Sequence, residues 1–485
     1  MIQVDNTIYS GIYADVQRAF PELKLDTSQS RFYSEVIAPC REIYSGAPPW
    51  KQVKRAGLSS KGQRDMETLN TAKVLCDEFS NMTFSEKTEI IISDERIQAY
   101  SNGVLDSNRF YSKMPAFLSL MYALGGGIIK CYAVDGAPVI DYLPADCFVP
   151  VEYSNRGITA GVFRSVSFVR NRYYSFFEYY DKGRVEYKLF RSSVQGQLGE
   201  ECPLAELYEG LPSSVDYGTD VPMFSYFFPA VSNNLAIGSP FGLSVFANSE
   251  STLKALDIAF DSFSREFILG RKRIIVPSSC VRTVVDADTG QPVRYFDSDD
   301  EVYQALSVGQ DQEMPKISDN TVSLRIEEHV GAINAYLNTL CAQTGLTSGT
   351  LAFDREGLKT ATEIVSENSK TYRTIRADKN LIEESLVQVV HALTALGEYL
   401  RLVPKGIEYE CSVAFNDGII EDHDKTIDNN IKLVDAGLQS RLGAIMEIYE
   451  CDEETAEKRL ERINEENAAS VYDFKEDDPN GTENS

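Results

Sequence analysis

Two stretches with helical spacing frame a short β-rich segment in the middle of the chain. Each stretch places apolar side chains at three- and four-residue intervals, which is typical of a helix that packs against helical neighbours. Between them, residues 274–322 hold β-branched runs and the turn signal Asp288-Thr289-Gly290. The pattern predicts a long helix, a small and mostly β module, and a long returning helix. The apolar stripes are Leu253, Leu256, Phe260, Phe263 and Phe267, then Ile326, Val330, Ile333, Leu337 and Leu340.

The preceding part of the chain, residues 61–240, alternates between helical and strand-like spacing and predicts an α+β domain. Gly125-Gly126-Gly127 lacks the lysine and Ser/Thr of a phosphate-binding loop, so it predicts a helix-to-strand turn with positive φ. The expected elements are helices over 66–79 and 114–123, a strand over 89–92, a hairpin of 128–133 and 138–143, and an antiparallel meander of 161–169, 173–180 and 184–191.

After the second stripe, a segment with three glycines leads to the capping box Thr360-Ala-Thr-Glu363. This box predicts the start of a helix that runs to about Leu400. Its first half is polar, so we expect that half to rest on something outside its own chain, which favours assembly. Residues 408–415 predict a strand that returns to the α+β domain. Short acidic helices and a disordered acidic tail from 469 to 485 are expected to follow.

The composition restricts the classes of function. The 485 residues carry 73 acidic and 47 basic side chains, a net charge of −26. Such a chain does not grip nucleic acid, because gripping requires phosphate neutralisation, but it can form a wall past which DNA slides. The nine cysteines show no CxxC pair and none lies near a histidine, which predicts buried thiols in a reducing compartment and no zinc site. Neither a signal peptide nor a membrane span is expected.

No catalytic constellation and no cofactor motif is found. Asp286 with Asp288, and Asp297 with Asp299 and Asp300, could chelate a divalent ion, but in a polar hairpin region solvated carboxylates are expected, and no metal site is predicted. Two basic clusters each leave two interpretations open. The first cluster, Lys51, Lys54 and Arg55, follows the only tryptophan, Trp50. It is either a solvated loop beside a packed indole or a contact with DNA or a neighbouring chain. Arg271, Lys272 and Arg273 either complement a helix dipole or face passing DNA.

Taken in order, these parts resemble a tailed-bacteriophage portal protein of the kind found in phages with long non-contractile tails. The resemblance rests on Ser239-Pro-Phe-Gly242 through Arg273, the inserted β module, the returning helix that ends at Thr344-Gly345-Leu346, and the box at 360–363. It implies a multi-part α+β fold. The expected parts are an N-terminal segment (1–60), an α+β wing (61–240), stem helices (241–272 and 323–345), a β-rich clip (273–322), a tunnel loop (346–359), a long wing helix (360–402), a return strand (403–424), a helical crown (425–468) and the tail.

The resemblance also implies a function without enzyme activity or cofactor. Family members form rings, usually of twelve subunits, at one capsid vertex of the virion, and double-stranded DNA passes through the axial channel. Expected partners are the terminase large subunit, head-completion or adaptor proteins, and the major capsid and scaffolding proteins, with assembly in the host cytoplasm and no membrane. The two apolar stripes would pack the stem, and residues 271–273 would face DNA. The tunnel loop would meet DNA through Thr347, Ser348, Gly349, Thr350, Asp354, Arg355 and Lys359, and the clip would dock partners through Asp286, Asp288, Asp297, Asp299, Asp300 and Glu301.

Two other classes of protein stay open on the sequence. One is a minor capsid or head–tail adaptor protein without a portal channel, and the other is an enzyme with an unrecognised site. Images of a ring with a central hole would separate a portal from the first, and ATP turnover by the isolated protein would favour the second.

Overall fold

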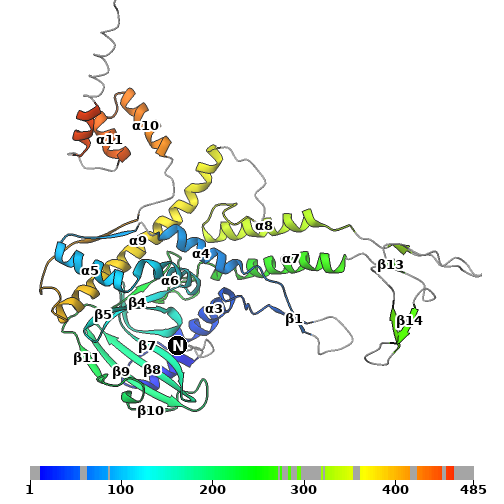
Figure 1. Ribbon diagram of the computed structural model, residues 1–485, viewed down its shortest axis with the longest axis horizontal. Helices are drawn as coiled ribbons and strands as arrows, with labels where there is room; N and C mark the ends of the chain where they lie inside the picture. Colours follow the sequence, from blue (N-terminus) through cyan, green and yellow to red (C-terminus); the bar gives the residue numbers. More distant parts are fainter. Residues whose placement is uncertain are drawn as a thin grey trace, which may run out of the picture. The chain divides into compact units, whose positions relative to one another are not determined.

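The computed structural model describes residues 11–54, 63–85, 88–270, 274–275, 282–285, 292–295, 318–319, 323–352, 361–415, 423–449 and 455–463 (Figure 1). The chain divides into two units, residues 1–415 and 416–485, and each is described by itself. The fold is α+β, which confirms the predicted class. The helices are α1 (Ile12–Ala19), α2 (Ser28–Phe32), a π-helical turn (Tyr33–Ile37), α3 (Ala38–Tyr44), α4 (Thr71–Thr83), α5 (Glu95–Ser107), α6 (Phe110–Leu124), α7 (Glu250–Leu269), α8 (Ile326–Thr344), α9 (Ala361–Tyr399), α10 (His423–Asp435) and α11 (Arg441–Tyr449).

The strands form small antiparallel sheets. The largest has the order β10-β9-β8-β7-β6, with β11 also paired to β9, and the second has the order β12-β4-β5. The bounds are β1 (Gln52–Lys54), β2 (Gln63–Asp65), β3 (Glu89–Ile92), β4 (Gly127–Val134), β5 (Ala137–Pro144), β6 (Phe148–Ser154), β7 (Gly157–Val169), β8 (Arg172–Asp181), β9 (Arg184–Ser192), β10 (Glu200–Cys202), β11 (Ser214–Asp216), β12 (Phe224–Phe227), β13 (Ile274–Ile275), β14 (Arg282–Val285), β15 (Pro292–Tyr295), β16 (Ser318–Asp319) and β17 (Cys411–Ala414).

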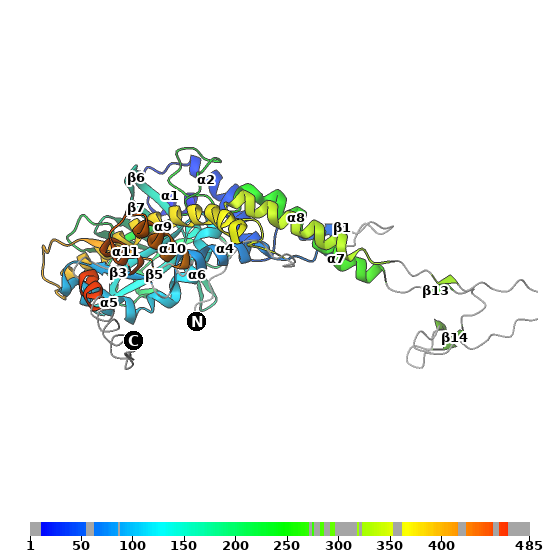
Figure 2. The same ribbon diagram turned by 90° about the horizontal axis from the view of Figure 1, so that it is seen from above.

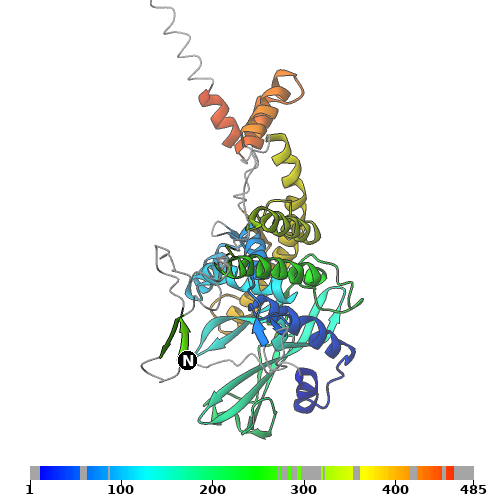
Figure 3. The same cartoon turned by 90° about the vertical axis from the view of Figure 1, so that its right-hand side faces the viewer.

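The predicted meander is confirmed as β7, β8 and β9, whose long strands form one twisted layer (Figure 3). The predicted hairpin is confirmed as β4 and β5, and both residues of its turn, Asp135 and Gly136, have positive φ. Gly125 ends α6 with a φ of 76°. A Cβ at this position would lie 2.7 Å from the backbone of Leu243 and Ser244, so the predicted turn also accommodates the chain that approaches α7.

The long helix α9 rests on the β12-β4-β5 sheet, on β17 and on two helices. It packs against β12, β4, β17, α4 and α5. The apolar stripe predicted for its second half is buried, at Ile382, Leu386, Val389, Leu393 and Leu396. The return strand is confirmed as β17, which pairs with β3. Thr360, the first residue of the predicted capping box, lies outside the described residues.

Two predicted helix starts are wrong. The first long helix starts at Glu250, and Phe246 is fully buried in the segment before it. The other helix was expected from residue 66 but starts at Thr71, after Asn70 in a left-handed conformation. The residues before Asn70 are not helical because they pair as strand β2 or donate backbone hydrogen bonds to α7, as described below.

The β-rich segment contains two short strand pairs, β13 with β16 and β14 with β15. The predicted turn at 288–290 lies between β14 and β15 but outside the described residues. In the second unit, the expected short helices are present as α10, α11 and residues 455–463. Among the helices that the structure describes, none is both long and apolar enough to cross a membrane.

Candidate functional site

Helices α7 and α8 lie side by side and run in opposite directions (Figures 1 and 2). At 20 and 19 residues, each is about 30 Å long at 1.5 Å per residue. Burial of the two predicted stripes decreases toward the ends that adjoin the β-rich segment, where Phe267 and Ile326 are 43 % and 44 % exposed in the single chain. Leu253, Leu256, Ile333, Leu337 and Leu340 are buried, and Phe260, Phe263 and Val330 are half-buried.

An ion pair joins the two helices where the β-rich segment leaves them. Arg325, directly before α8, donates two hydrogen bonds to the Glu266 carboxylate on α7, from Nε at 3.1 Å and from Nη2 at 2.8 Å. His329 Nε2 lies 3.8 Å from the same carboxylate, and its ring contacts Phe263. The Arg325 hydrogen bonds lower the pKa of Glu266 to about 2. The pair links the two helices at this end.

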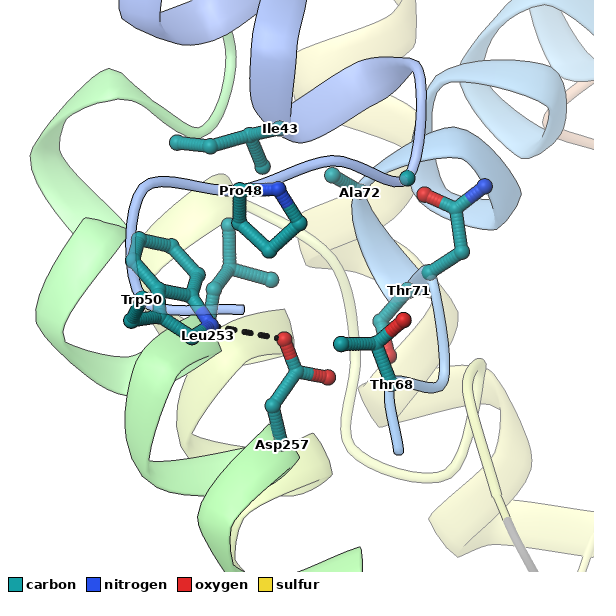
Figure 4. A pocket seen from close by; sticks show the side chains of 10 residues that line it. Ile43, Pro48, Trp50, Thr68, Thr71, Ala72, Leu253 and Asp257 are labelled. Carbon is teal, nitrogen blue, oxygen red and sulfur yellow. Dashed lines mark hydrogen bonds between the residues drawn. The ribbon is translucent and has the colours of Figure 1, made fainter. Parts of the chain in front are cut away.

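Two carboxylates on α7 hold the segment that follows α3. Asp257 and Asp261 are four residues apart, so they lie on one helix face. Asp257 Oδ2 accepts a hydrogen bond from Trp50 Nε1 at 2.9 Å, shown as the dashed line in Figure 4. Its other oxygen accepts from the backbone N–H of Leu69 at 3.1 Å. The indole is therefore packed against α7. Burial raises the pKa of Asp257, and the hydrogen bonds from Trp50 and Leu69 oppose that change.

Asp261 holds the same segment one helical turn further along. Arg64 donates to both of its oxygens, at 2.7 and 2.5 Å, and the backbone N–H of Glu67 donates to Oδ1 at 3.2 Å. The Arg64 hydrogen bonds lower the pKa of Asp261. The hairpin of β1 and β2 is thus held against α7 through Trp50, which precedes β1, and through Arg64 in β2. Of the basic cluster noted in the sequence, the Lys51 ammonium donates to the Gly46 carbonyl, and the Lys54 side chain and Arg55 lie outside the described residues.

Replacing Asp261 by asparagine should loosen this hairpin without unfolding the domain. The carboxamide cannot reproduce the bidentate contact with Arg64, and a charged hydrogen bond contributes about 1.5–3 kcal/mol. We expect trypsin to cleave between residues 51 and 64 about tenfold faster, because cleavage tracks the population of the opened segment. Peptide mass spectrometry over time would measure it. Glu250→Gln, on the first turn of the same helix, is the matched control, and equal rates for the two variants would contradict the fastening.

The start of the predicted tunnel loop is bound to the helices on either side. Gly345 ends α8 with a φ of 84°, and its carbonyl accepts a hydrogen bond from Thr374 Oγ1 on α9. The backbone N–H of Thr347 donates to Thr371 Oγ1 at 2.9 Å, and that of Gly349 donates to Asn338 Oδ1 at 3.0 Å. Residues 347–350 therefore lie along α8 and α9, with Ser348 exposed.

The remaining residues predicted for the DNA-facing and docking surfaces lie outside the described part of the chain, so their roles stay predictions. These are Asp354, Arg355 and Lys359 of the loop, Arg271, Lys272 and Arg273 after α7, and Asp286, Asp288, Asp297, Asp299, Asp300 and Glu301 of the β-rich segment.

A buried carboxylate connects α9 with the core below it. Asp378 Oδ1 accepts a hydrogen bond from the backbone N–H of Ala230 at 2.7 Å. The Tyr122 hydroxyl on α6 donates to the same carboxylate and lies 2.7 Å from Thr83 Oγ1 at the end of α4. Burial raises the pKa of Asp378 to about 7, against the lowering effect of these hydrogen bonds. One carboxylate thus connects α9, α6 and the segment that leads to α7.

Sequence inspection missed these carboxylates. For Asp257 and Asp261 a signal was available, because two acids four residues apart beside an apolar stripe indicate a partner on that face. Asp378 gave no such signal among the polar residues of α9. Within the ranges that the structure describes, no group of three or more histidine, cysteine, aspartate or glutamate side chains is placed to hold a metal ion.

One family model matches this chain, over residues 63–471. The family is described as phage portal protein, SPP1 Gp6-like. The matched range starts at β2 and continues past the last described helix, so it includes α7, α8, α9 and both strand pairs between α7 and α8. No curated protein matches the sequence.

Proposed function

The chain belongs to the SPP1 Gp6-like family of phage portal proteins, and on this premise we propose that it forms a ring of about twelve subunits at one vertex of the capsid. The family consists of structural proteins of the virion, and its partners take part in capsid assembly and DNA packaging. In the proposal, double-stranded DNA enters and leaves through the axial channel of the ring, and the protein itself catalyses no reaction.

The observation that supports a ring is the exposed apolar surface on α7 and α8. Phe267, Ile268 and Ile326 are exposed at one end of the helix pair, and Ile258 and Tyr336 are exposed further along it. A soluble monomer gains nothing from such side chains, whereas copies of the pair arranged around an axis would bury them. Ring closure requires a heterologous interface, in which each subunit presents two different faces to its neighbours.

The charge of the chain suits passage of DNA better than its retention. At −26 per chain, a ring of about twelve subunits would carry a large negative charge. DNA would be repelled by most of the wall and held only transiently where basic side chains reach it. We assign such transient contacts to Arg355 and Lys359 of the tunnel loop and to residues 271–273.

The remaining parts receive roles that follow from the same premise. The clip, 273–322, would dock the terminase large subunit during packaging and head-completion or adaptor proteins afterwards, with its acidic side chains meeting these partners. The wing would contact the major capsid or scaffolding proteins during assembly in the host cytoplasm. Residues 425–468 would form the crown.

Imaging the purified full-length protein by negative-stain electron microscopy tests the proposal. Class averages should show rings with a central hole, and mass photometry should give a particle of about twelve chains. A monodisperse monomer at micromolar concentration would contradict the ring. Solid particles without a channel would favour an adaptor or minor capsid protein, and ATP turnover would favour an enzyme.

Reversing two charges in the tunnel loop should impair packaging but leave assembly unchanged. Arg355→Glu with Lys359→Glu removes the proposed phosphate contacts and adds repulsion. We expect normal rings and roughly tenfold less DNA protected from nuclease in assembled heads. The control is Arg401→Glu with Lys405→Glu, which makes the same change in charge at exposed positions after α9. Normal packaging by the loop variant would show that these side chains do not meet DNA.

A further inference from the structure

A groove of about 730 Å³ lies between the two sheets of the wing, within the range of ~300–1,000 Å³ that is common for ligand sites. Side chains of β4 and β5 line one wall and side chains of β7, β8 and β9 line the other. The loop from Tyr208 to Pro212, Tyr217 and Tyr399 at the end of α9 complete its rim. None of these residues belongs to the stem, clip or tunnel-loop surfaces discussed above.

The strand registers determine the chemistry of the groove. Lys130 on β4 lies opposite Asp141 on β5, and Glu178 on β8 lies opposite Tyr187 on β9. The Lys130 ammonium donates to Glu178 and lies 3.7 Å from Asp141. It also lies 5.1 Å from the centre of the Tyr132 ring and 5.7 Å from that of Phe163. The floor of the groove therefore already accommodates one cation between carboxylates and aromatic rings.

The outer part of the groove also combines carboxylates with aromatic rings, but no basic side chain of the lining lies among them. Asp135 and Glu209 are exposed at the rim, and Tyr208, Tyr217 and Tyr399 supply aromatic faces. The two basic groups of the lining, Lys130 and Arg164, are both paired, since Arg164 Nη1 lies 2.8 Å from Asp15. The charged groups of the lining that have no internal counter-charge are therefore carboxylates, and they present a negative charge to a ligand.

One polar group in the lining has no internal partner and is accessible from the groove. The Tyr187 side chain is only 8 % exposed and its ring stacks on Phe176. Among the described residues, no donor or acceptor forms a hydrogen bond with its hydroxyl, and the hydroxyl oxygen keeps accessible surface at the groove that it lines. A peptide carbonyl entering the groove could accept this proton. A charged polyamine could donate to the hydroxyl oxygen but has no acceptor for its proton.

We propose that this groove binds a polypeptide segment of another protein through a lysine or arginine side chain. The cationic group lies among the rim carboxylates and the tyrosine rings, and the backbone of the segment accepts a hydrogen bond from Tyr187. Charge complementarity favours a basic peptide over an acidic or purely apolar one, and the Tyr187 hydroxyl favours a ligand with a backbone carbonyl over a free polyamine. The site does not depend on the proposed ring.

The test uses the full-length protein and the fluorescein-labelled peptide Gly-Arg-Gly-Arg-Gly, followed by fluorescence anisotropy. Because a chain of net charge −26 attracts any cation, the decisive comparison is between two variants with equal change in charge. Asp135→Asn with Glu209→Gln neutralises the rim of the groove. Glu200→Gln with Glu201→Gln neutralises two exposed carboxylates on β10, outside the lining.

We expect the rim variant to bind the peptide about tenfold more weakly and the β10 variant to bind within twofold of the unmodified protein. Tyr187→Phe, which keeps the stacked ring, should weaken binding of the peptide more than binding of spermine. A photo-crosslinking version of the peptide should label residues of β4, β5 or the 208–212 loop. Equal losses in the two charge variants, no saturable binding, or equal sensitivity of spermine to Tyr187→Phe would each overturn the proposal.

Discussion

Replacing Glu178 by alanine should lower the free energy of unfolding by about 3–5 kcal/mol, the usual cost of leaving one partner of a buried ion pair without its counter-charge. Lys130 and Glu178 are 5 % and 9 % exposed. Burial lowers the pKa of Lys130, but the carboxylates of Glu178 and Asp141 outweigh it, so the pKa lies above its usual value and the ammonium is charged. The Asp141 side chain is 44 % exposed and 3.7 Å away, so it cannot replace Glu178. Denaturant unfolding at a fixed protein concentration measures the loss.

A control and a rescue distinguish this effect from a general loss of acidic charge. Glu201→Ala, at an exposed position on β10, should change stability by less than about 0.5 kcal/mol. Lys130→Met combined with Glu178→Met should be more stable than Glu178→Ala, because it removes both buried charges and fills the space with apolar side chains. If the double variant is no more stable than the single one, the loss comes from side-chain packing and not from the unpaired ammonium.

The hairpin, the meander and the second half of α9 could be predicted from the sequence because local signals determine them, whereas α5 and β6 of the wing were not predicted. β8 is itself rich in aromatic residues, and a turn at Lys182-Gly183 leads from it to β9. The turn at Asp135-Gly136 fixes the register of β4 with β5. The second half of α9 carries an unbroken apolar stripe, and that stripe is buried. In each case the residues that determine the element are close together in the chain.

The sequence did not predict contacts between residues that are far apart in the chain. The hydrogen bond between Trp50 and Asp257 joins residues 207 positions apart. The same carboxylate accepts the Leu69 N–H, which holds the chain before α4 outside the helix. Lys130 lies within the strand expected over 128–133, but nothing in the local spacing indicates Glu178 as its partner. Periodicity identifies which face of an element is buried and does not identify what covers it.

The same limit applies to the stem. The apolar stripes predicted two helices that need helical neighbours, and α7 and α8 supply part of that packing to each other. The surface that they leave exposed, around Phe267 and Ile326, has its proposed partner in another copy of the chain. The described residues of a single chain do not cover that surface, so the stem-packing role of these residues stays a prediction that the ring experiment tests.

Stability should also depend on pH through Asp378. Its pKa in the folded protein is about 7, against 3.8 for an ordinary aspartate, because burial disfavours the charged form. Between about pH 4 and pH 7 the folded chain therefore keeps a proton that the unfolded chain has released. The contribution of this group to stability falls as pH rises through that window, and it is constant above and below it.

Replacing Asp378 by asparagine should remove this dependence. The asparagine side-chain carbonyl can still accept the hydrogen bond from the Ala230 N–H, and no charge has to be buried at high pH. The free energy of unfolding of the variant minus that of the unmodified protein should rise by about 3 kcal/mol between pH 5 and pH 8, at about 1.4 kcal/mol per pKa unit. Taking this difference at each pH cancels the contributions of other titrating groups. A difference that does not change with pH would show that Asp378 is charged, or neutral, in the folded protein throughout this range.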